Sequence, residues 1–368
     1  MSYERDNIRR MRGYSYGEQP DDPDIVKLNT NENPYPPSPR VAEALAAFDA
    51  DRLRRYPPPT AGPFRALAAE RLGLAPEQVL ATNGGDEALR LAVTAFVDPG
   101  GAFAMADPSY SLYEVLAHVQ DCRVEAVPMT KDWSLPGDFA ERVNDAGARL
   151  TCVVNPHAPS GALLYADDLA RLAAALDGVL LIDEAYVDFV DPELEHDATP
   201  LVREFDNVLL LRTLSKGYSL AGLRFGFLAG AAGLIEPMAT KVRDSYNQDL
   251  LAQELAVAAF GDEAHARQTW RRVREERSRL YGALVARGFR VPPSQANFLL
   301  AWPLIGGPAA TPEQVSVTVF QDLRARGILV RLLEHPRLRR ALRITVGTRE
   351  ENEGLLAALD EIVEARCY

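Results

Sequence analysis

Short apolar runs alternate with helix-length amphipathic segments through much of the chain, and no other sequence feature limits the fold so strongly. Seven of these runs are predicted to be strands, at residues 79–81, 102–106, 123–127, 150–154, 179–182, 208–211 and 225–228. Helix-length segments lie between several of them, at residues 86–97, 109–119 and 166–176. Strands that alternate with helices predict an α/β fold with a mainly parallel sheet that is covered by helices on both faces.

The regions before and after this alternation have a different character. Residues 1–38 are rich in Pro, Asn, Asp and Tyr without a sustained period, which predicts an N-terminal arm that packs on the small domain or on a partner subunit. Beyond residue 250, helices and strands follow in mixed order, with helices at residues 251–260, 263–287, 312–326 and from 350, and strands at 297–301, 328–330 and 342–346. We therefore predict a large domain over residues 39–260 and a smaller α+β domain over residues 261–368.

Composition narrows the class of protein. Of the 368 residues 47% are hydrophobic and 25% are charged, as in ordinary globular domains. The formal charge of -12 argues against nucleic acid as a partner. The amino terminus is charged where a secretory signal needs an apolar core, and no apolar run is long enough to span a bilayer. Neither the three cysteines nor the five histidines show the spacing of metal ligands. We expect a cytoplasmic enzyme that acts on small molecules, without a metal or a membrane partner.

Lysine is rare in this chain, and one lysine occupies an unusual position. The 40 basic residues include only four lysines, Lys27, Lys131, Lys216 and Lys241. Lys216 follows the apolar run 208–211, within the stretch TLSKGYSLAGLRFGF. Arginine keeps its proton in water, whereas a partly buried lysine can become a neutral amine that attacks a carbonyl. Because ligands gather at the carboxyl ends of parallel strands, this lysine is a candidate nucleophile.

Groups that suit a phosphate lie at other strand ends. The stretch NGGDEALRLAV places Gly84 and Gly85 where a helix is expected to begin, and there backbone N–H groups and the helix dipole favour an anion. Ser215 and Arg224 lie near the lysine in sequence and offer a hydroxyl and a guanidinium. Together these groups predict a phosphate-binding site beside Lys216.

Asp183 ends another apolar run and begins the stretch DEAYVDF. A buried carboxylate can keep a pyridine nitrogen protonated, and Asn155 and Tyr186 can both hydrogen-bond to a ring hydroxyl. A lysine for a Schiff base, a carboxylate for the ring nitrogen and an anchored phosphate describe a site for pyridoxal 5'-phosphate.

Several blocks together resemble a known family. NPHAPSG, DEAYVDF, TLSKGYSLAGLRFGF and LRITVGT occur in the order typical of fold-type I pyridoxal phosphate aminotransferases. KLNTNENPYPPSP, RYPPP and NGGDEAL make the chain resemble the histidinol-phosphate aminotransferase family in particular. The resemblance runs from about Tyr14 to the last helix. It implies a homodimer that moves an amino group from L-histidinol phosphate to 2-oxoglutarate, a step of histidine biosynthesis.

The resemblance also implies roles around the cofactor ring. Lys216 would form the Schiff base and then carry a proton between substrate and cofactor. Asp183 would pair with the pyridine nitrogen, Asn155 and Tyr186 would bind the phenolic oxygen, and Tyr110 would stack on the ring.

Further roles concern the phosphate and the substrate. The resemblance assigns the cofactor phosphate to Gly85, the backbone N–H of Asp86, Ser215, Arg224 and, from the neighbouring subunit, Tyr56. Arg343 would bind the carboxylate of the amino-group acceptor, since a guanidinium can form a bidentate ion pair with a carboxylate. For the substrate, Arg331 would contact the phosphate group, and Tyr14 and Asn31 on the arm would border the site.

One departure leaves the substrate open. The aminotransferases commonly read NPNNPTG where this chain has NPHAPSG, so His157 and Ala158 replace two asparagines. His157 is either a turn residue or a residue that faces the substrate. The alternatives on a similar scaffold are an aromatic aminotransferase and a threonine-phosphate decarboxylase. A regulatory module without catalysis is disfavoured by the intact lysine, aspartate and arginines. A dinucleotide-dependent oxidoreductase is disfavoured because no GxGxxG follows the first strand.

Overall fold

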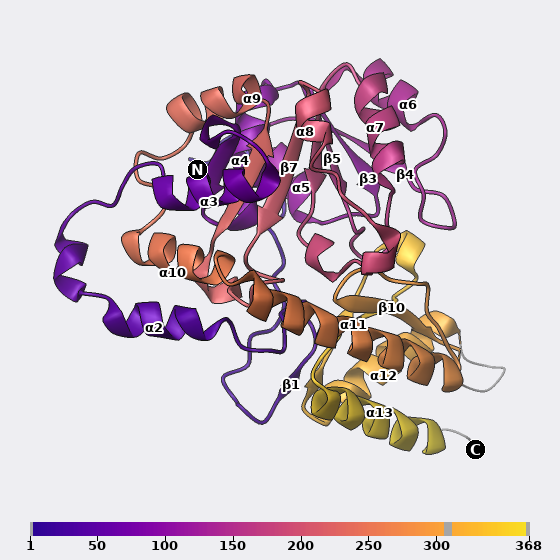
Figure 1. Cartoon of the computed structure of the whole chain (residues 1–368). Coiled ribbons are helices and arrows are strands. Elements are labelled where there is room, and N and C mark those ends of the chain that lie inside the picture. The colour runs from indigo at the N-terminus through magenta and orange to yellow at the C-terminus, as the bar shows by residue number, and fades with distance from the viewer. Residues whose placement is uncertain (1–2, 305–310, 366–368) are drawn as a thin grey trace.

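A computed structural model describes residues 3–304 and 311–365 of the chain (Figure 1). Its largest sheet has the strand order β2-β8-β7-β6-β5-β3-β4. All neighbouring strands from β7 to β4 are parallel, and only β8 runs against its two neighbours. The strands are β2 (Val79–Thr82), β3 (Ala102–Asp107), β4 (Arg123–Pro128), β5 (Ala148–Val154), β6 (Val179–Asp183), β7 (Val208–Thr213) and β8 (Gly226–Gly230). The predicted mainly parallel sheet is confirmed.

Helices cover this sheet on both faces. Every residue of β2 and β8 is buried, and because successive side chains of a strand point to opposite faces, both faces must be covered. The predicted helical segments correspond to α4, α5 and α7, each within a few residues of its predicted ends. The helices in this part of the chain are α2 (Pro39–Ala47), α3 (Gly62–Leu72), α4 (Gly84–Phe96), α5 (Leu112–Val119), α6 (Phe139–Asp145), α7 (Ala166–Ala175), α8 (Leu201–Glu204), α9 (Ala232–Pro237) and α10 (Leu250–Phe260).

The C-terminal part builds a second, antiparallel sheet in the order β12-β13-β10-β9. Three helices accompany it, and in Figure 1 they lie together below the large sheet. The elements are α11 (Glu263–Ala286), β9 (Phe289–Arg290), β10 (Phe298–Pro303), α12 (Pro312–Ala325), β12 (Arg331–Leu332), β13 (Leu342–Thr345) and α13 (Arg349–Glu364). No helix in the described part of the chain is long and apolar enough to cross a membrane.

Helix α11 connects the hydrophobic cores of the two parts. Trp270 and Val273, in its first half, pack into the core of the large sheet. Leu280 and Leu284, in its second half, pack into the separate core under the small sheet. The predicted domain limit at residues 260 and 261 falls just before this helix and stays a prediction.

The N-terminal arm crosses from one part to the other. A short helix that the sequence did not predict, α1 (Asp6–Arg10), lies beside α5, where the Asn7 amide donates to the His118 carbonyl at 2.9 Å. Further along, β1 (Val26–Lys27) pairs in parallel with β11 (Ile328–Leu329) of the C-terminal part. The arm therefore passes over the junction between the two sheets.

Candidate active site

Lys216 lies three residues beyond the end of β7, where the sequence predicted a ligand site. Its side chain is held against the arm, because Nζ donates a hydrogen bond to the carbonyl of Thr30 at 2.8 Å. Burial lowers the pKa of Lys216 to about 8, and the positive charge of Arg343 acts in the same direction. At pH 7 roughly a tenth of this lysine is therefore a neutral amine, far more than for an ordinary lysine, and a nucleophile must be neutral.

Asp183 is the last residue of β6, and its carboxylate is buried beside Tyr113. The Tyr113 hydroxyl donates to Oδ2 at 2.8 Å, and the backbone N–H of Ala185 donates to Oδ1 at 3.1 Å. Burial raises the pKa of Asp183 to about 6, whereas the bond from Tyr113 lowers it. Sequence reasoning missed Tyr113, although it lies three residues after Tyr110 and could have been expected near it.

The positively charged side chain of Arg224 lies at the N-terminus of α4. The guanidinium of Arg224 is so close to Gly84 that a Cβ atom added there would lie 2.6 Å from Nη2. The same guanidinium contacts Ser215 Oγ and Asp86 Oδ2, both at 3.4 Å. Of the predicted phosphate ligands, Ser215, Asp86 and Arg224 are therefore brought together. A Cβ atom on Gly85 would meet Leu211 at 3.2 Å, which makes Gly85 a site of close packing against β7.

The family resemblance assigned a role only to the backbone N–H of Asp86, and its carboxylate makes contacts of its own. It contacts Arg224, and it also accepts a long hydrogen bond of 3.4 Å from the Tyr110 hydroxyl. A bound phosphate would share the donors of the guanidinium with this carboxylate.

Arg343 projects from β13 into the space near Lys216. Its Nη2 donates to the carbonyl of Asn29 at 3.0 Å, and its guanidinium lies 5.5 Å from the centre of the Phe298 ring. Nε is buried and has no hydrogen-bond partner in the described structure. A half-buried cation whose buried Nε is an unused donor can bind a carboxylate, which agrees with the predicted role.

The arm brings Asn31 and Tyr14 to the site. Asn31 Nδ2 donates to the Tyr186 hydroxyl at 3.1 Å, and both side chains are buried. The Tyr14 ring meets the Tyr110 ring edge to face, with the ring centres 5.9 Å apart. Arg331 holds the same arm, because its guanidinium donates to the carbonyls of two arm residues, Ser15 at 3.0 Å and Tyr16 at 3.3 Å.

Asn155 lies directly beside Asp183, because its backbone N–H donates to the Asp183 carbonyl at 2.8 Å. Its side chain is fully buried, and the amide exchanges hydrogen bonds of 2.8 and 3.0 Å with the backbone of Leu164 and lies 3.4 Å from His196 Nε2. Tyr56 is 80% exposed and stacks on Tyr246, with ring centres 4.5 Å apart. Within one described chain, Tyr56 therefore faces solvent and not the site.

His157 is a turn residue in this structure. Nε2 lies 2.8 Å from the Pro108 carbonyl, so it must be the protonated nitrogen, and Nδ1 lies 2.7 Å from Ser160 Oγ. Burial lowers the pKa of His157 to about 4, which keeps the ring neutral. The histidine thus fastens the NPHAPSG turn to the strand end that precedes Tyr110.

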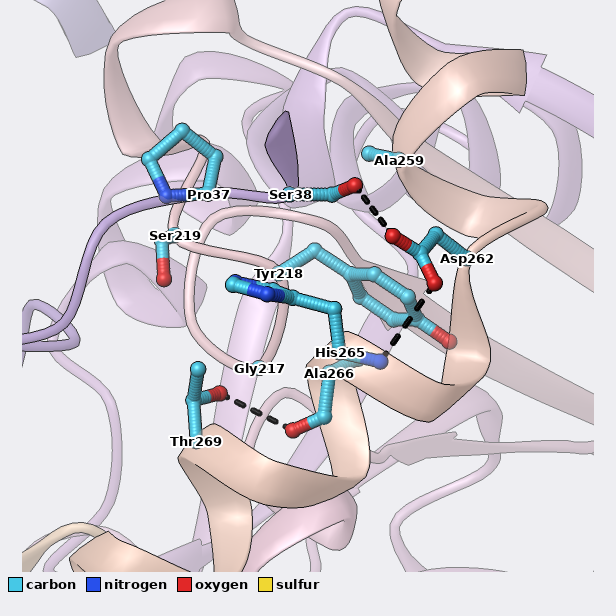
Figure 2. A pocket seen from close by; sticks show the side chains of 10 residues that line it. All are labelled: Pro37, Ser38, Gly217, Tyr218, Ser219, Ala259, Asp262, His265, Ala266 and Thr269. Atoms are coloured by element: carbon cyan, nitrogen blue, oxygen red, sulfur yellow. Dashed lines mark hydrogen bonds between the residues drawn. The ribbon is translucent and has the colours of Figure 1, made fainter. Parts of the chain in front are cut away.

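A small cavity of about 10 Å³ lies behind the lysine loop (Figure 2). Gly217, Tyr218 and Ser219 line one side of it, and Asp262 and His265 lie on the other. Its volume leaves room for about one water molecule, so it offers no site for a substrate.

The assembled groups fit an anionic, carbonyl-bearing aromatic cofactor. Four groups each match one part of this cofactor or of its substrate. They are a buried carboxylate with free lone pairs, a lysine of lowered pKa, a guanidinium at a helix N-terminus, and a buried Arg343 Nε without a partner. Lys216 would carry its carbonyl carbon, Asp183 its ring nitrogen, and Arg224 with Ser215 its phosphate.

Comparison with known proteins agrees with this geometry. The family model described as aminotransferase class I and II matches residues 23–359.

The chain belongs to the class I and II aminotransferases.

Its similarity to individual aminotransferases extends over nearly the whole chain. Histidinol-phosphate aminotransferase 1 of Trichormus variabilis is 41% identical over 363 residues, which cover 98% of this chain and 99% of that protein. Histidinol-phosphate aminotransferase of Synechocystis is 42% identical over 355 residues, or 96% of this chain and 97% of that protein. The solved structure of histidinol-phosphate aminotransferase from Sinorhizobium meliloti, in complex with pyridoxal-5'-phosphate, has the same fold, with a TM-score of 0.86, 22% identity and coverage of 99% and 98%. These findings confirm the predicted fold class, transaminase activity and pyridoxal phosphate cofactor.

Proposed function

We propose that this aminotransferase converts L-histidinol phosphate and 2-oxoglutarate into imidazole acetol phosphate and L-glutamate. The similarity of about 41% over nearly the full length to proteins named histidinol-phosphate aminotransferase carries this proposal. When bound, pyridoxal phosphate supplies an aldehyde that takes up the amino group and a ring that withdraws electrons from the neighbouring carbon.

The groups around Lys216 divide the remaining work. Lys216 moves the proton between the two carbon atoms that change, because its lowered pKa lets it act as acid and as base near neutral pH. Asp183 holds the ring nitrogen in its protonated form. Burial raises the pKa of the Tyr186 hydroxyl, so this group stays protonated and can donate to the ring oxygen.

Two arginines distinguish the two half-reactions. Arg343, with its free Nε, binds a carboxylate of 2-oxoglutarate. Arg331 faces the arm beside Tyr14 and supplies positive charge for the phosphate of the donor. The arm, held by β11 and Arg331, covers the substrate and keeps water from the reacting atoms.

The active unit in this proposal is a cytoplasmic homodimer. Tyr56 is too exposed to serve the site of its own chain and stacks on Tyr246, which is itself 45% exposed. A pair of exposed aromatic rings is a typical anchor of a protein interface. We infer that Tyr56 reaches the cofactor phosphate of the neighbouring subunit.

The absorption spectrum of the cofactor-loaded protein tests the proposed donor. L-histidinol phosphate, added without a keto acid, should convert the spectrum to that of the amine form of the cofactor, and 2-oxoglutarate should restore it. A spectrum that responds instead to an aromatic amino acid, or a release of carbon dioxide from O-phosphothreonine, would replace this function by the corresponding alternative.

Substitution of Lys216 tests the chemistry. Lys216→Ala should abolish transamination while the protein still folds, because the neighbouring lysine, Lys27, is paired with Glu32 and cannot replace it as a neutral amine. Lys241→Ala is a matched control, since Lys241 is an exposed lysine that pairs with Glu236 at 3.6 Å. Near-normal turnover of the Lys216 variant would rule out the mechanism.

A further inference from the structure

Two charged residues of the arm lie beside Lys216, and the proposed function leaves both without a role. They are Lys27, one of the four lysines of the chain, and Glu32, both within the stretch KLNTNENP. Lys27 Nζ bonds to the carboxylate of Glu32 and to the hydroxyl of Thr30. The Thr30 hydroxyl also donates to Glu32 Oε2 at 2.8 Å. The three side chains form a closed cluster, which we call the arm cluster.

The arm cluster connects directly to Lys216 through one residue. Thr30 contributes its hydroxyl to the cluster, and its carbonyl accepts the hydrogen bond from Lys216 Nζ at 2.8 Å. The next residue, Asn31, is fixed by bonds from its backbone N–H to Thr345 Oγ1 at 3.0 Å and from Asn297 to its carbonyl at 2.9 Å. The backbone that presents this acceptor is therefore held in place by the small sheet.

The charges near Lys216 come from several elements. Arg343 on β13 and Arg224 at the N-terminus of α4 are positive and lower the pKa of Lys216, as does Lys27 on β1. Glu32 is negative and raises it. Because Lys27 and Glu32 are paired, their fields largely cancel at Lys216. Removal of either partner would expose the amine to the charge of the other.

We propose that Lys27 is a positioning residue for Lys216: paired with Glu32, it holds the Thr30 carbonyl as an acceptor and prevents the Glu32 carboxylate from stabilising the protonated lysine. Whenever Lys216 is not bonded to the cofactor, its amine rests on the Thr30 carbonyl. This inference rests on the proposed role of Lys216 as the reactive amine.

The four lysines make a direct measurement possible. In the full chain labelled with [13Cε]lysine and free of cofactor, at most four side-chain signals are expected, and Lys216→Arg identifies the one that belongs to Lys216. Its shift, followed against pH, gives the pKa of the amine. Lys27→Met should raise this pKa by on the order of one unit, which lowers the neutral fraction at pH 7 about tenfold.

Substitution of Glu32, the partner of Lys27, should shift the pKa of Lys216 in the opposite direction. Glu32→Gln should lower the pKa of Lys216, because the attractive carboxylate is lost and the positive Lys27 remains. The double variant Lys27→Met with Glu32→Gln should return the pKa close to that of the unchanged protein. Glu18→Gln is the matched control, since it breaks another ion pair of the arm, the 3.0 Å contact with Arg324, and it should leave the Lys216 pKa unchanged.

The possible failures are distinct. An unchanged pKa in both single variants, or a shift in the same direction in both, would overturn the inference, since the latter shows that a loosened arm and not charge acts on the lysine. The rate at which added pyridoxal phosphate bonds to Lys216 should follow the neutral fraction in each variant. A chain with native Lys27 and Glu32 that does not capture pyridoxal phosphate at Lys216 would instead contradict the proposed function.

Discussion

At the scale of single residues, the Tyr113 hydroxyl controls how readily Asp183 ionises. Asp183 is buried, and desolvation favours its neutral acid form. A hydrogen bond to the charged form favours the carboxylate, and Tyr113 makes one at 2.8 Å. In the proposed site the ring nitrogen of the cofactor needs the carboxylate, so we infer that Tyr113 supports cofactor binding through Asp183.

Tyr113→Phe should therefore weaken cofactor binding on the acid side. Asp183 has a pKa of about 6, and loss of the donor raises it further. Because the carboxylate exists only above its pKa, the pH below which pyridoxal phosphate affinity is lost should move up by on the order of one unit. Titration of cofactor into the cofactor-free protein at several pH values measures this shift.

The exposed Tyr165 provides a control for this experiment. Its side chain is 53% exposed, so Tyr165→Phe removes a hydroxyl of the same kind in a place where water replaces it. The control should bind cofactor as the unchanged protein does. A Tyr113→Phe protein with the same pH dependence as this control would show that the hydrogen bond has no electrostatic role.

At the scale of elements, the start of α4 depends on a glycine, because a side chain at this position would collide with Arg224. Gly84 adopts φ +72, a conformation that side chains rarely adopt, and its empty Cβ position lets Arg224 lie on the helix N-terminus. The positive end of the helix dipole and the guanidinium of Arg224 therefore lie at the same point, and their electrostatic potentials add.

Gly84→Ala should displace Arg224 and weaken binding of pyridoxal phosphate by about tenfold or more, since an added Cβ would lie 2.6 Å from Nη2. The left-handed backbone should also cost about 1 kcal/mol of folding stability. Gly233→Ala in α9 is the control, because a Cβ there meets nothing within 4 Å. Equal cofactor affinity in the two variants, measured by fluorescence titration, would contradict this account of the cradle.

At the scale of the whole molecule, two contacts besides helix α11 and the arm help to hold the C-terminal part against the large sheet. One is a third hydrophobic cluster around Trp302 and Leu338, against which Trp133 packs. The other is a polar contact in which His335 Nε2 lies 3.0 Å from Asp107 Oδ1, at the end of β3. The site lies where the arm crosses this junction, so its geometry depends on how the two parts sit together.

The proposed homodimer can be tested by mixing two defective proteins. Lys216→Ala lacks the amine, and Tyr56→Ala lacks the group that we propose acts across the interface. In a mixed dimer of a symmetric enzyme, one of the two sites keeps both residues, so an equal mixture should recover about one quarter of full activity at limiting cofactor. Recovery is measured after the subunits exchange, and its absence would place Tyr56 outside the neighbouring site.

Much of the molecule could be predicted from local patterns. Most strands of the large sheet are almost completely buried, so their apolar runs stand out between helices of normal length, and only the edge strand β4 has mainly half-buried and exposed residues. Elements of only two residues, such as β9 and β12, and the five-residue α1 were not predicted, since their stability comes from distant partners and not from their own sequence.

The sequence by itself determined the α/β class, the candidate lysine at a strand end and the family, because the apolar runs of the strands and the LSKGYSLAGLR motif are local. Tertiary structure alone decided the rest. It placed Tyr113 on Asp183, folded the arm so that Thr30 meets Lys216 across 186 residues of sequence, and turned His157 into the protein interior. Such contacts join segments far apart in the chain, and no local pattern encodes the distance or the burial that sets their chemistry.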